Sequence, residues 1–147
     1  MYSVFTYGTL QINEIMQAVT GRVFDSKYGL LENYARYAIK NQVFPGIIPE
    51  PGSTVQGVIY HGIDPVSLQY LDAFEDDLYE RQTLLIVDKL GNELTAEVFV
   101  VNNKYRRLLA DKAWDLDSFR RTHLGLYLAS CRRFHNSMSQ EIHGTQE

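Results

Sequence analysis

Short strand-like segments joined by tight turns constrain the fold of this chain more than any other feature. Residues 54–61 alternate in a strand-like way, and two apolar segments, 81–88 and 94–101, flank a Leu-Gly-Asn-Glu turn at 90–93. Because strands outnumber helices and do not alternate regularly with them, the sequence predicts an α+β fold with a mixed or largely antiparallel sheet. A closed or half-closed small β-barrel with a few packed helices is favoured over a parallel, doubly wound sheet.

The first third of the chain adds two predicted strands and a predicted loop. Aromatic and β-branched residues over 2–7 stop at Gly8, which indicates a strand followed by a turn. Residues 27–40 have a strand-like pattern that Glu32-Asn33 interrupts. The stretch 44–52 contains three prolines and two glycines, a composition typical of a loop.

Start and stop signals predict three helices. Asn13 is the expected N-cap of the first helix and Gly21 its stop signal, Asp64 precedes a proline at the start of the second, and Asp115 or Asp117 begins the last. The core-facing positions of the second helix are Leu68, Leu71 and Phe74. The expected stripe of the last helix is Leu116, Phe119, His123, Leu126 and Tyr127.

The length and composition indicate one domain. At 147 residues and 45% hydrophobic content, the chain can bury one core, which we assign to residues 1–134. Residues 135–147 are polar and are predicted to form a flexible tail.

Several classes of partner are disfavoured. The net charge is −4 and no basic run exceeds two residues, so nucleic acid is not expected. No window approaches 18 apolar residues and the N-terminus lacks a leader-like pattern, so no membrane association is expected. Cys131 is the only cysteine, which excludes an intrachain disulfide and favours a cytoplasmic protein. It lacks metal-ligand spacing with the four histidines, so we expect neither a metal nor a cofactor.

Two segments carry residues suited to catalysis or binding. Gly8 directly follows a predicted strand, where a positive φ and free backbone amides form a cradle for an anion. Glu75 lies four residues after the core-facing Leu71, so it is expected to be partly buried while Asp76 and Asp77 rotate away. The alternative is that this acidic cluster is a solvated helix end.

Tyr79 and Arg81 follow on the same face of the next strand. One interpretation places both at the site, where they orient Glu75. In the other, Arg81 pairs with Asp72 or Glu75 and Tyr79 fills the edge of the core.

Five motifs in this order carry a resemblance to a known family. They are Val4-Phe5-Thr6-Tyr7-Gly8-Thr9-Leu10, Phe44-Pro45-Gly46, Gly57-Val58-Ile59-Tyr60, Leu71-Asp72-x-Phe74-Glu75-x-x-x-Tyr79-x-Arg81, and Trp114-Asp115 with Phe119 and His123-Leu124. Together they resemble the gamma-glutamylcyclotransferase-like superfamily, and the last motif its AIG2-like branch. The resemblance implies a small mixed barrel with outer helices, and one pocket between the turn at Tyr7–Leu10 and Glu75. Two positions depart from the family pattern: Leu78 replaces a common acidic residue and Phe99 a common tyrosine.

The implied activity is a cyclotransferase that releases 5-oxoproline and a free amine from a γ-glutamyl amide or isopeptide, a small-molecule substrate. The resemblance assigns catalysis to Glu75. It assigns substrate binding to Tyr7, Gly8, Thr9, Leu10, Tyr79 and Arg81. Two alternatives remain open at this point: a non-catalytic binding module with the same pocket, and a protein-interaction domain that uses the tail after His135. The leaving amine and the oligomeric state are not defined by the sequence.

Overall fold

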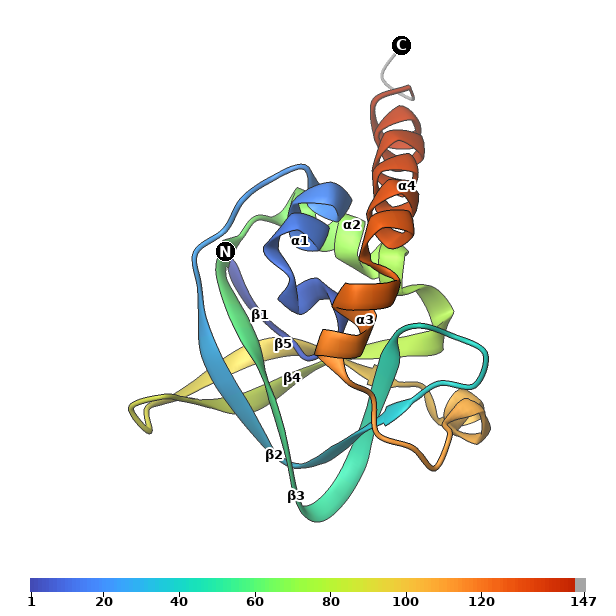
Figure 1. Cartoon of the computed structure of the whole chain (residues 1–147). Coiled ribbons are helices and arrows are strands. Elements are labelled where there is room, and N and C mark those ends of the chain that lie inside the picture. The colour runs from blue at the N-terminus through green and yellow to red at the C-terminus, as the bar shows by residue number, and fades with distance from the viewer. Residues whose placement is uncertain (145–147) are drawn as a thin grey trace.

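Five strands close into a barrel in a computed structural model of the protein, which describes residues 1–144 (Figure 1). The strands are β1 (Tyr2–Thr6), β2 (Ser26–Ala38), β3 (Pro45–Ile63), β4 (Tyr79–Asp88) and β5 (Glu93–Val101). Their order around the barrel is β1-β3-β2-β4-β5; β1 and β5 pair in parallel and the other neighbours are antiparallel. The predicted α+β barrel is therefore confirmed.

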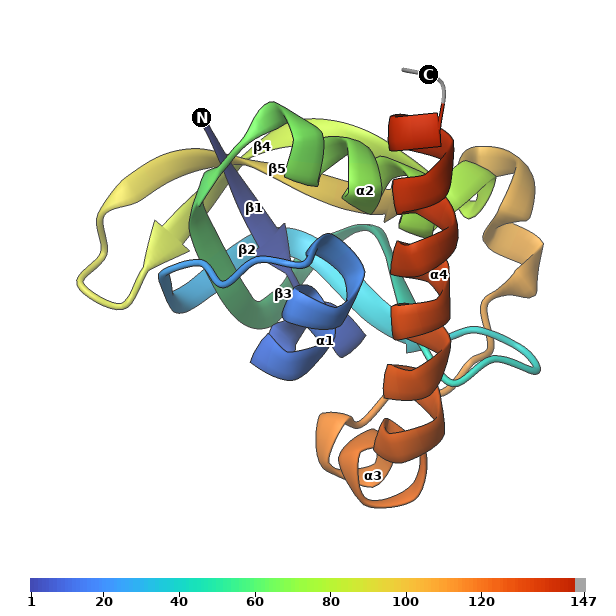
Figure 2. The ribbon, with the colours of Figure 1, turned by 90° about the horizontal axis from the view of Figure 1, so that it is seen from above.

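The helices gather at one end of the barrel, where α1, α2 and α4 lie close together (Figure 2). The α-helices are α1 (Asn13–Thr20), α2 (Pro65–Glu75), α3 (Leu116–Thr122) and α4 (Leu124–Gly144), and three short 3-10 turns are η1 (Thr9–Gln11), η2 (Asp76–Leu78) and η3 (Asn103–Leu108). One apolar cluster joins the helices to β1, and a second fills the barrel. None of the helices described here is long and apolar enough to cross a membrane.

The local start and stop signals mostly act as predicted. Asp64 caps α2 through its Oδ2, which accepts from Ser67 N at 3.2 Å, and Gly21 ends α1 with φ 79°. Asn13 is not the N-cap of α1. Ile12 caps both the end of η1 and the start of α1, so Asn13 is already the first residue of the helix. The Asn13 side chain instead lies 3.2 Å from the Tyr60 hydroxyl.

The predicted loop at 44–52 is wrong, because β3 begins at Pro45 and continues through it. This half of β3 pairs with β2, with Ile48 opposite Ala35. Proline is tolerated at the first position of a strand. Gly46 is needed for packing and not for a turn, since a Cβ there would lie 2.2 Å from Val101 Cγ2. The predicted interruption of β2 is confirmed by a register shift after Glu32.

The predicted flexible tail is wrong as far as Gly144, because α4 runs across the expected boundary at 134; residues 145–147 lie outside the described part. His135 Nδ1 is 2.8 Å from Val19 O on α1, and its ring stacks on Tyr70 of α2 at 4.8 Å. The Tyr70 hydroxyl is 2.7 Å from Ser139 Oγ. Polar side chains thus tie α4 to the body of the protein, a long-range effect that composition does not reveal.

The predicted single stripe on the last helix is also wrong. Asp115 caps α3 as expected, but the chain breaks at His123, where φ is −120°, before α4 begins. The break changes the direction of the following residues. Phe119 is buried, whereas Leu126 is 84% exposed.

Candidate active site

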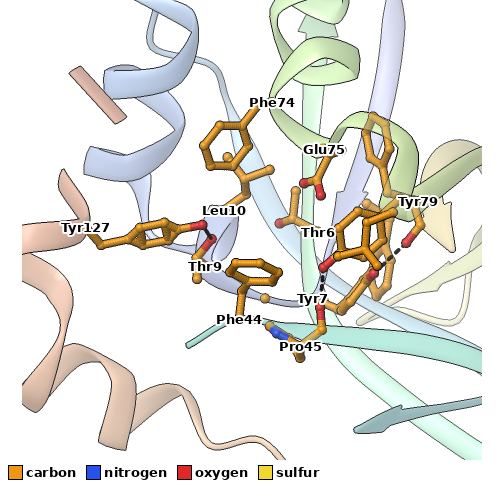
Figure 3. Close-up of a pocket in the computed structure, with 14 residues that line it drawn as sticks. Thr6, Tyr7, Thr9, Leu10, Phe44, Pro45, Phe74, Glu75, Tyr79 and Tyr127 are labelled. Carbon is orange, nitrogen blue, oxygen red and sulfur yellow. Dashed lines mark hydrogen bonds between the residues drawn. The ribbon is translucent and has the colours of Figure 1, made fainter. Parts of the chain in front are cut away.

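A pocket of about 240 Å³ opens where the end of β1 meets the end of α2, the start of β4 and the first half of α4 (Figure 3). Most of its lining is apolar or aromatic. The lining residues are Phe5, Thr6, Tyr7, Gly8, Thr9, Leu10, Phe44, Pro45, Phe74, Glu75, Leu78, Tyr79, Phe99 and Tyr127. All predicted site residues except Arg81 are therefore brought together.

The turn after β1 forms one wall of this pocket. Its first hydrogen bond runs from Gln11 N to Gly8 O at 3.1 Å, so the amides of Thr9 and Leu10 have no acceptor within the turn. The positive φ expected at Gly8 is wrong, since φ is −122°. Glycine is required there by crowding: a Cβ would lie 2.9 Å from Pro45 Cδ.

Glu75 is the last residue of α2 and points into the pocket (Figure 3). Its side chain is half-buried, whereas the following Asp76 and Asp77 are exposed, as the helical spacing predicted. No hydrogen bond or ion pair joins the Glu75 carboxyl group to another residue of the described chain. Burial without a compensating partner raises the pKa of Glu75 to about 8.

Tyr7 and Tyr79 line the pocket together with this carboxyl group. The Tyr7 hydroxyl donates to Phe99 O, and the Tyr79 hydroxyl donates to Pro45 O at 2.6 Å. Burial raises the pKa of Tyr7 well above its ordinary value, and the nearby Glu75 adds to this effect. Burial is also the main cause of the raised pKa of Tyr79. Both phenols therefore stay protonated and fix the pocket wall.

Tyr127 on α4 is a lining residue that the sequence had placed only in a core stripe. Its hydroxyl oxygen accepts a hydrogen bond from Thr9 Oγ1 at 3.2 Å, so its own proton stays free for another acceptor. Helical periodicity placed Tyr127 on an inward face but gave no sign that this face borders a cavity. Phe44 and Phe74 line the pocket beside it.

Arg81 lies outside the pocket lining. Its Nε donates to Asp72 Oδ1 at 2.9 Å, and its Nη1 donates to Glu97. The structure thus contains the ion pair between Arg81 and Asp72 that one of the two interpretations predicted. Arg81 does not pair with Glu75.

The two departures from the family pattern, Leu78 and Phe99, both line the pocket. Phe99 contributes its backbone carbonyl to the Tyr7 hydroxyl and offers no hydroxyl of its own. Neither the site nor the rest of the described chain contains three or more His, Cys, Asp or Glu side chains grouped as metal ligands. Cys131 is buried within the helical cluster, which raises the pKa of its thiol to about 11.

Comparison with known protein families identifies the relatives of this chain. The sequence profile of "Gamma-glutamyl cyclotransferase, AIG2-like" matches residues 4–116. The chain belongs to this family. AIG2-like protein D of Arabidopsis thaliana is 30% identical over 136 residues, which cover 91% of this chain and 89% of that protein. The profile match over residues 4–116 includes every predicted site residue.

Solved structures of the AIG2-like and cyclotransferase group share the fold. A solution structure of an Arabidopsis thaliana protein is 25% identical, covers 90% of this chain and 80% of its own, and has a TM-score of 0.68. A structure described as a gamma-glutamyl cyclotransferase is 15% identical, with 89% and 86% coverage and a TM-score of 0.57. At 15% identity, the similarity to the second structure shows only that the fold is shared.

Proposed function

We propose that this AIG2-like protein is a γ-glutamyl cyclotransferase that converts a γ-glutamyl amide or isopeptide into 5-oxoproline and a free amine. The observation that carries the proposal is the unpaired Glu75 carboxyl group, with its pKa raised to about 8, facing the backbone turn at Gly8–Leu10 across one small pocket.

The reaction closes a ring within the substrate. The α-amino nitrogen attacks the γ-carbonyl carbon, a new C–N bond forms, and the original amide C–N bond breaks. Two protons leave the attacking ammonium nitrogen and two reach the departing nitrogen, which is released as an ammonium ion, so atoms and charge balance without water or a protein nucleophile. The protein has to orient the two ends of the substrate and move these protons.

Orientation is assigned to the turn after β1. In this proposal the Thr9 and Leu10 amides bind the substrate α-carboxylate, because backbone N–H groups aimed at one point favour an anion. This contact places the neighbouring α-amino group near Glu75. Tyr127, whose proton is free, donates to a substrate oxygen. Tyr7 and Tyr79 keep the wall rigid through their own hydrogen bonds.

Proton transfer is assigned to Glu75. A substrate α-amino group has a pKa of about 8, whereas an ordinary glutamate has one of about 4.3, a poor match for rapid transfer in both directions. Burial brings the pKa of Glu75 to about 8 and removes this mismatch. Glu75 can then accept a proton from the substrate ammonium, which frees the lone pair for attack, and pass it to the departing nitrogen. The second proton follows the same route as the ring closes.

Arg81 has no direct role in this mechanism. Its guanidinium is held by Asp72 and Glu97, which gives it a structural role at the junction of α2, β4 and β5. The residues proposed to contact the substrate are therefore Tyr7, Gly8, Thr9, Leu10, Tyr79, Tyr127 and the catalytic Glu75.

The test is incubation of the purified protein with a panel of γ-glutamyl amines, amino acids and peptides, with 5-oxoproline measured by mass spectrometry. We expect 5-oxoproline from at least one member, at a rate that depends on protein concentration. Binding of panel members by calorimetry without any product supports the alternative, a non-catalytic binding module. Absence of both binding and product contradicts both functions.

A further inference from the structure

Resting on the proposed function, we infer that Arg36 is a positioning residue of the active site. It holds the carbonyl group of Tyr7 from outside the pocket and so directs the Gly8 N–H, beside those of Thr9 and Leu10, toward the α-carboxylate of the substrate.

Most of the turn after β1 is fixed by its own local hydrogen bonds. Gly8 O accepts from Gln11 N at 3.1 Å, and Thr9 O accepts from Ile12 N at 3.1 Å. These two carbonyls belong to the peptide groups that carry the N–H groups of Thr9 and Leu10, and a planar peptide group turns as one unit. The direction of these two N–H groups is therefore set within the turn.

The peptide group between Tyr7 and Gly8 is held differently, by a side chain of another strand. Arg36 on β2 donates from Nη1 to Tyr7 O at 2.7 Å and to Gln56 O at 3.2 Å. No peptide bond of the described chain is cis, so the Gly8 N–H points away from the carbonyl that Arg36 holds. Gly8 lines the active-site pocket, whereas Arg36 does not. No residue of the described chain accepts a hydrogen bond from this N–H, which leaves it available to a ligand.

The charge of Arg36 adds to this effect. No acidic side chain of the described chain forms an ion pair with it, and the nearby Asp115 uses Oδ2 to cap α3 through Ser118 N at 2.8 Å. Burial lowers the pKa of Arg36, although an arginine stays charged at neutral pH. A cation at the carbonyl end of a peptide group polarises it and strengthens the hydrogen bond that its N–H gives to an anion.

Trp114 restrains Arg36 from the other side. The Arg36 guanidinium lies over the Trp114 ring, 5.8 Å from its centroid, and Trp114 Nε1 donates to Val43 O at 2.8 Å. A cation over an indole face is attracted to it, so the ring limits the positions that the guanidinium can take. The Trp114-Asp115 motif, which has no part in the proposed chemistry, thereby acts on the pocket through Arg36.

Substrates with and without the α-carboxylate test the role of Arg36. The γ-glutamyl amide with the fastest turnover is compared with the corresponding 4-aminobutyramide, which lacks only that carboxylate and closes to 2-pyrrolidinone. We expect Arg36→Met to lower kcat/KM about 30-fold for the γ-glutamyl amide, the effect of losing support for a hydrogen bond to a charged group. The analogue should lose less than about threefold. Equal losses on both substrates show a structural role alone and overturn the inference.

Two further variants separate the charge from the fold. Arg36→Lys keeps the charge and a donor, so we expect it to return kcat/KM for the γ-glutamyl amide to within about fivefold of the parent. Lys27→Met removes a cation from the same strand, together with its ion pair to Asp88, and should behave like the parent. If Arg36→Met does not fold, Arg36→Gln takes its place. Arg36→Lys that is no more active than the neutral variant contradicts the role of charge.

The outcomes separate this inference from the proposed function. If 5-oxoproline forms but both substrates lose activity equally, the cyclotransferase function stands and the inference fails. If the parent turns over neither substrate, the function fails for them. In that case, and also if only the analogue is inert, calorimetry with 5-oxoproline and 5-oxoprolinamide decides the inference.

The calorimetric criterion again depends on the carboxylate. The inference requires Arg36→Met to weaken binding of 5-oxoproline at least about tenfold, while binding of the uncharged 5-oxoprolinamide changes less than about threefold. Any other result, including no binding of 5-oxoproline to the parent, contradicts it.

Discussion

Arg81 donates to Asp72 Oδ1 at 2.9 Å and so leaves Glu75, three residues further along α2, without a cation. A carboxyl group paired with an arginine is ordinarily stabilised as an anion. Here the paired carboxylate is the exposed Asp72, and the half-buried Glu75 keeps its raised pKa of about 8.

The pH dependence of turnover should reflect Glu75. Its carboxyl group must lose a proton before it can accept one, so kcat/KM should fall about tenfold per pH unit below an acid-limb midpoint near 8. The substrate α-amino group, with a pKa of about 8, becomes nucleophilic when it loses its proton, so no alkaline limb is expected from it. Initial rates across the pH range measure the acid limb. An acid-limb midpoint near the ordinary glutamate value of about 4.3 would contradict the raised pKa.

The free energy of unfolding should also depend on pH through Glu75. Because the pKa of Glu75 is higher in the folded than in the unfolded state, the folded protein binds more protons between about pH 4.3 and 8, and its stability falls as pH rises through this window. Glu75→Gln removes the titration. Urea unfolding should show the parent losing up to about 1.4 kcal/mol per pH unit relative to Glu75→Gln. A constant difference between the two proteins across the window contradicts the prediction.

Arg81→Ala should lower stability without lowering specific activity. It removes the ion pairs to Asp72 and Glu97 but no atom of the pocket lining, so we expect a loss of about 1 kcal/mol in the free energy of unfolding. Lys104→Ala, which breaks a more exposed pair with Asp77, is the control and should cost less. Loss of kcat in folded Arg81→Ala protein would restore Arg81 to the active site.

Gly8→Ala should damage the carboxylate cradle. The added Cβ would lie 2.9 Å from Pro45 Cδ, so the turn must move away from the wall that it now contacts. We expect kcat/KM to fall by about 10²-fold, as for other small misplacements of a binding group. Gly125→Ala on α4 is the control, because its Cβ would meet no atom within 4 Å. Equal activity of the two variants would remove the turn from the mechanism.

Local rules in the sequence predicted the features that depend on neighbouring residues. Asp64 caps α2, Gly21 ends α1, and the four-residue spacing from Leu71 places Glu75 at the pocket, because each depends on one turn of backbone. The strand pattern and short turns predicted the barrel, and the resemblance to the family added the pocket between Glu75 and the turn at Gly8.

Contacts between distant segments account for what the sequence did not predict. Pro45 belongs to a strand because β2 pairs with it, and His135 belongs to a helix because Val19 and Tyr70 hold it. Tyr127 reaches the pocket only after the chain breaks at His123 and α4 takes a new direction. None of these relations leaves a periodic or compositional signal.

The most direct test of the account compares Glu75→Gln with Asp76→Asn, the matching change at the neighbouring exposed carboxylate. Turnover of a γ-glutamyl amide to 5-oxoproline and calorimetric binding of the same compound are measured for both variants and the parent. We predict that Glu75→Gln retains binding but loses about 10²–10⁴-fold in kcat, the usual contribution of a general acid–base, while Asp76→Asn behaves like the parent. Release of 5-oxoproline by Glu75→Gln at the parental rate would contradict the central claim that Glu75 transfers the proton.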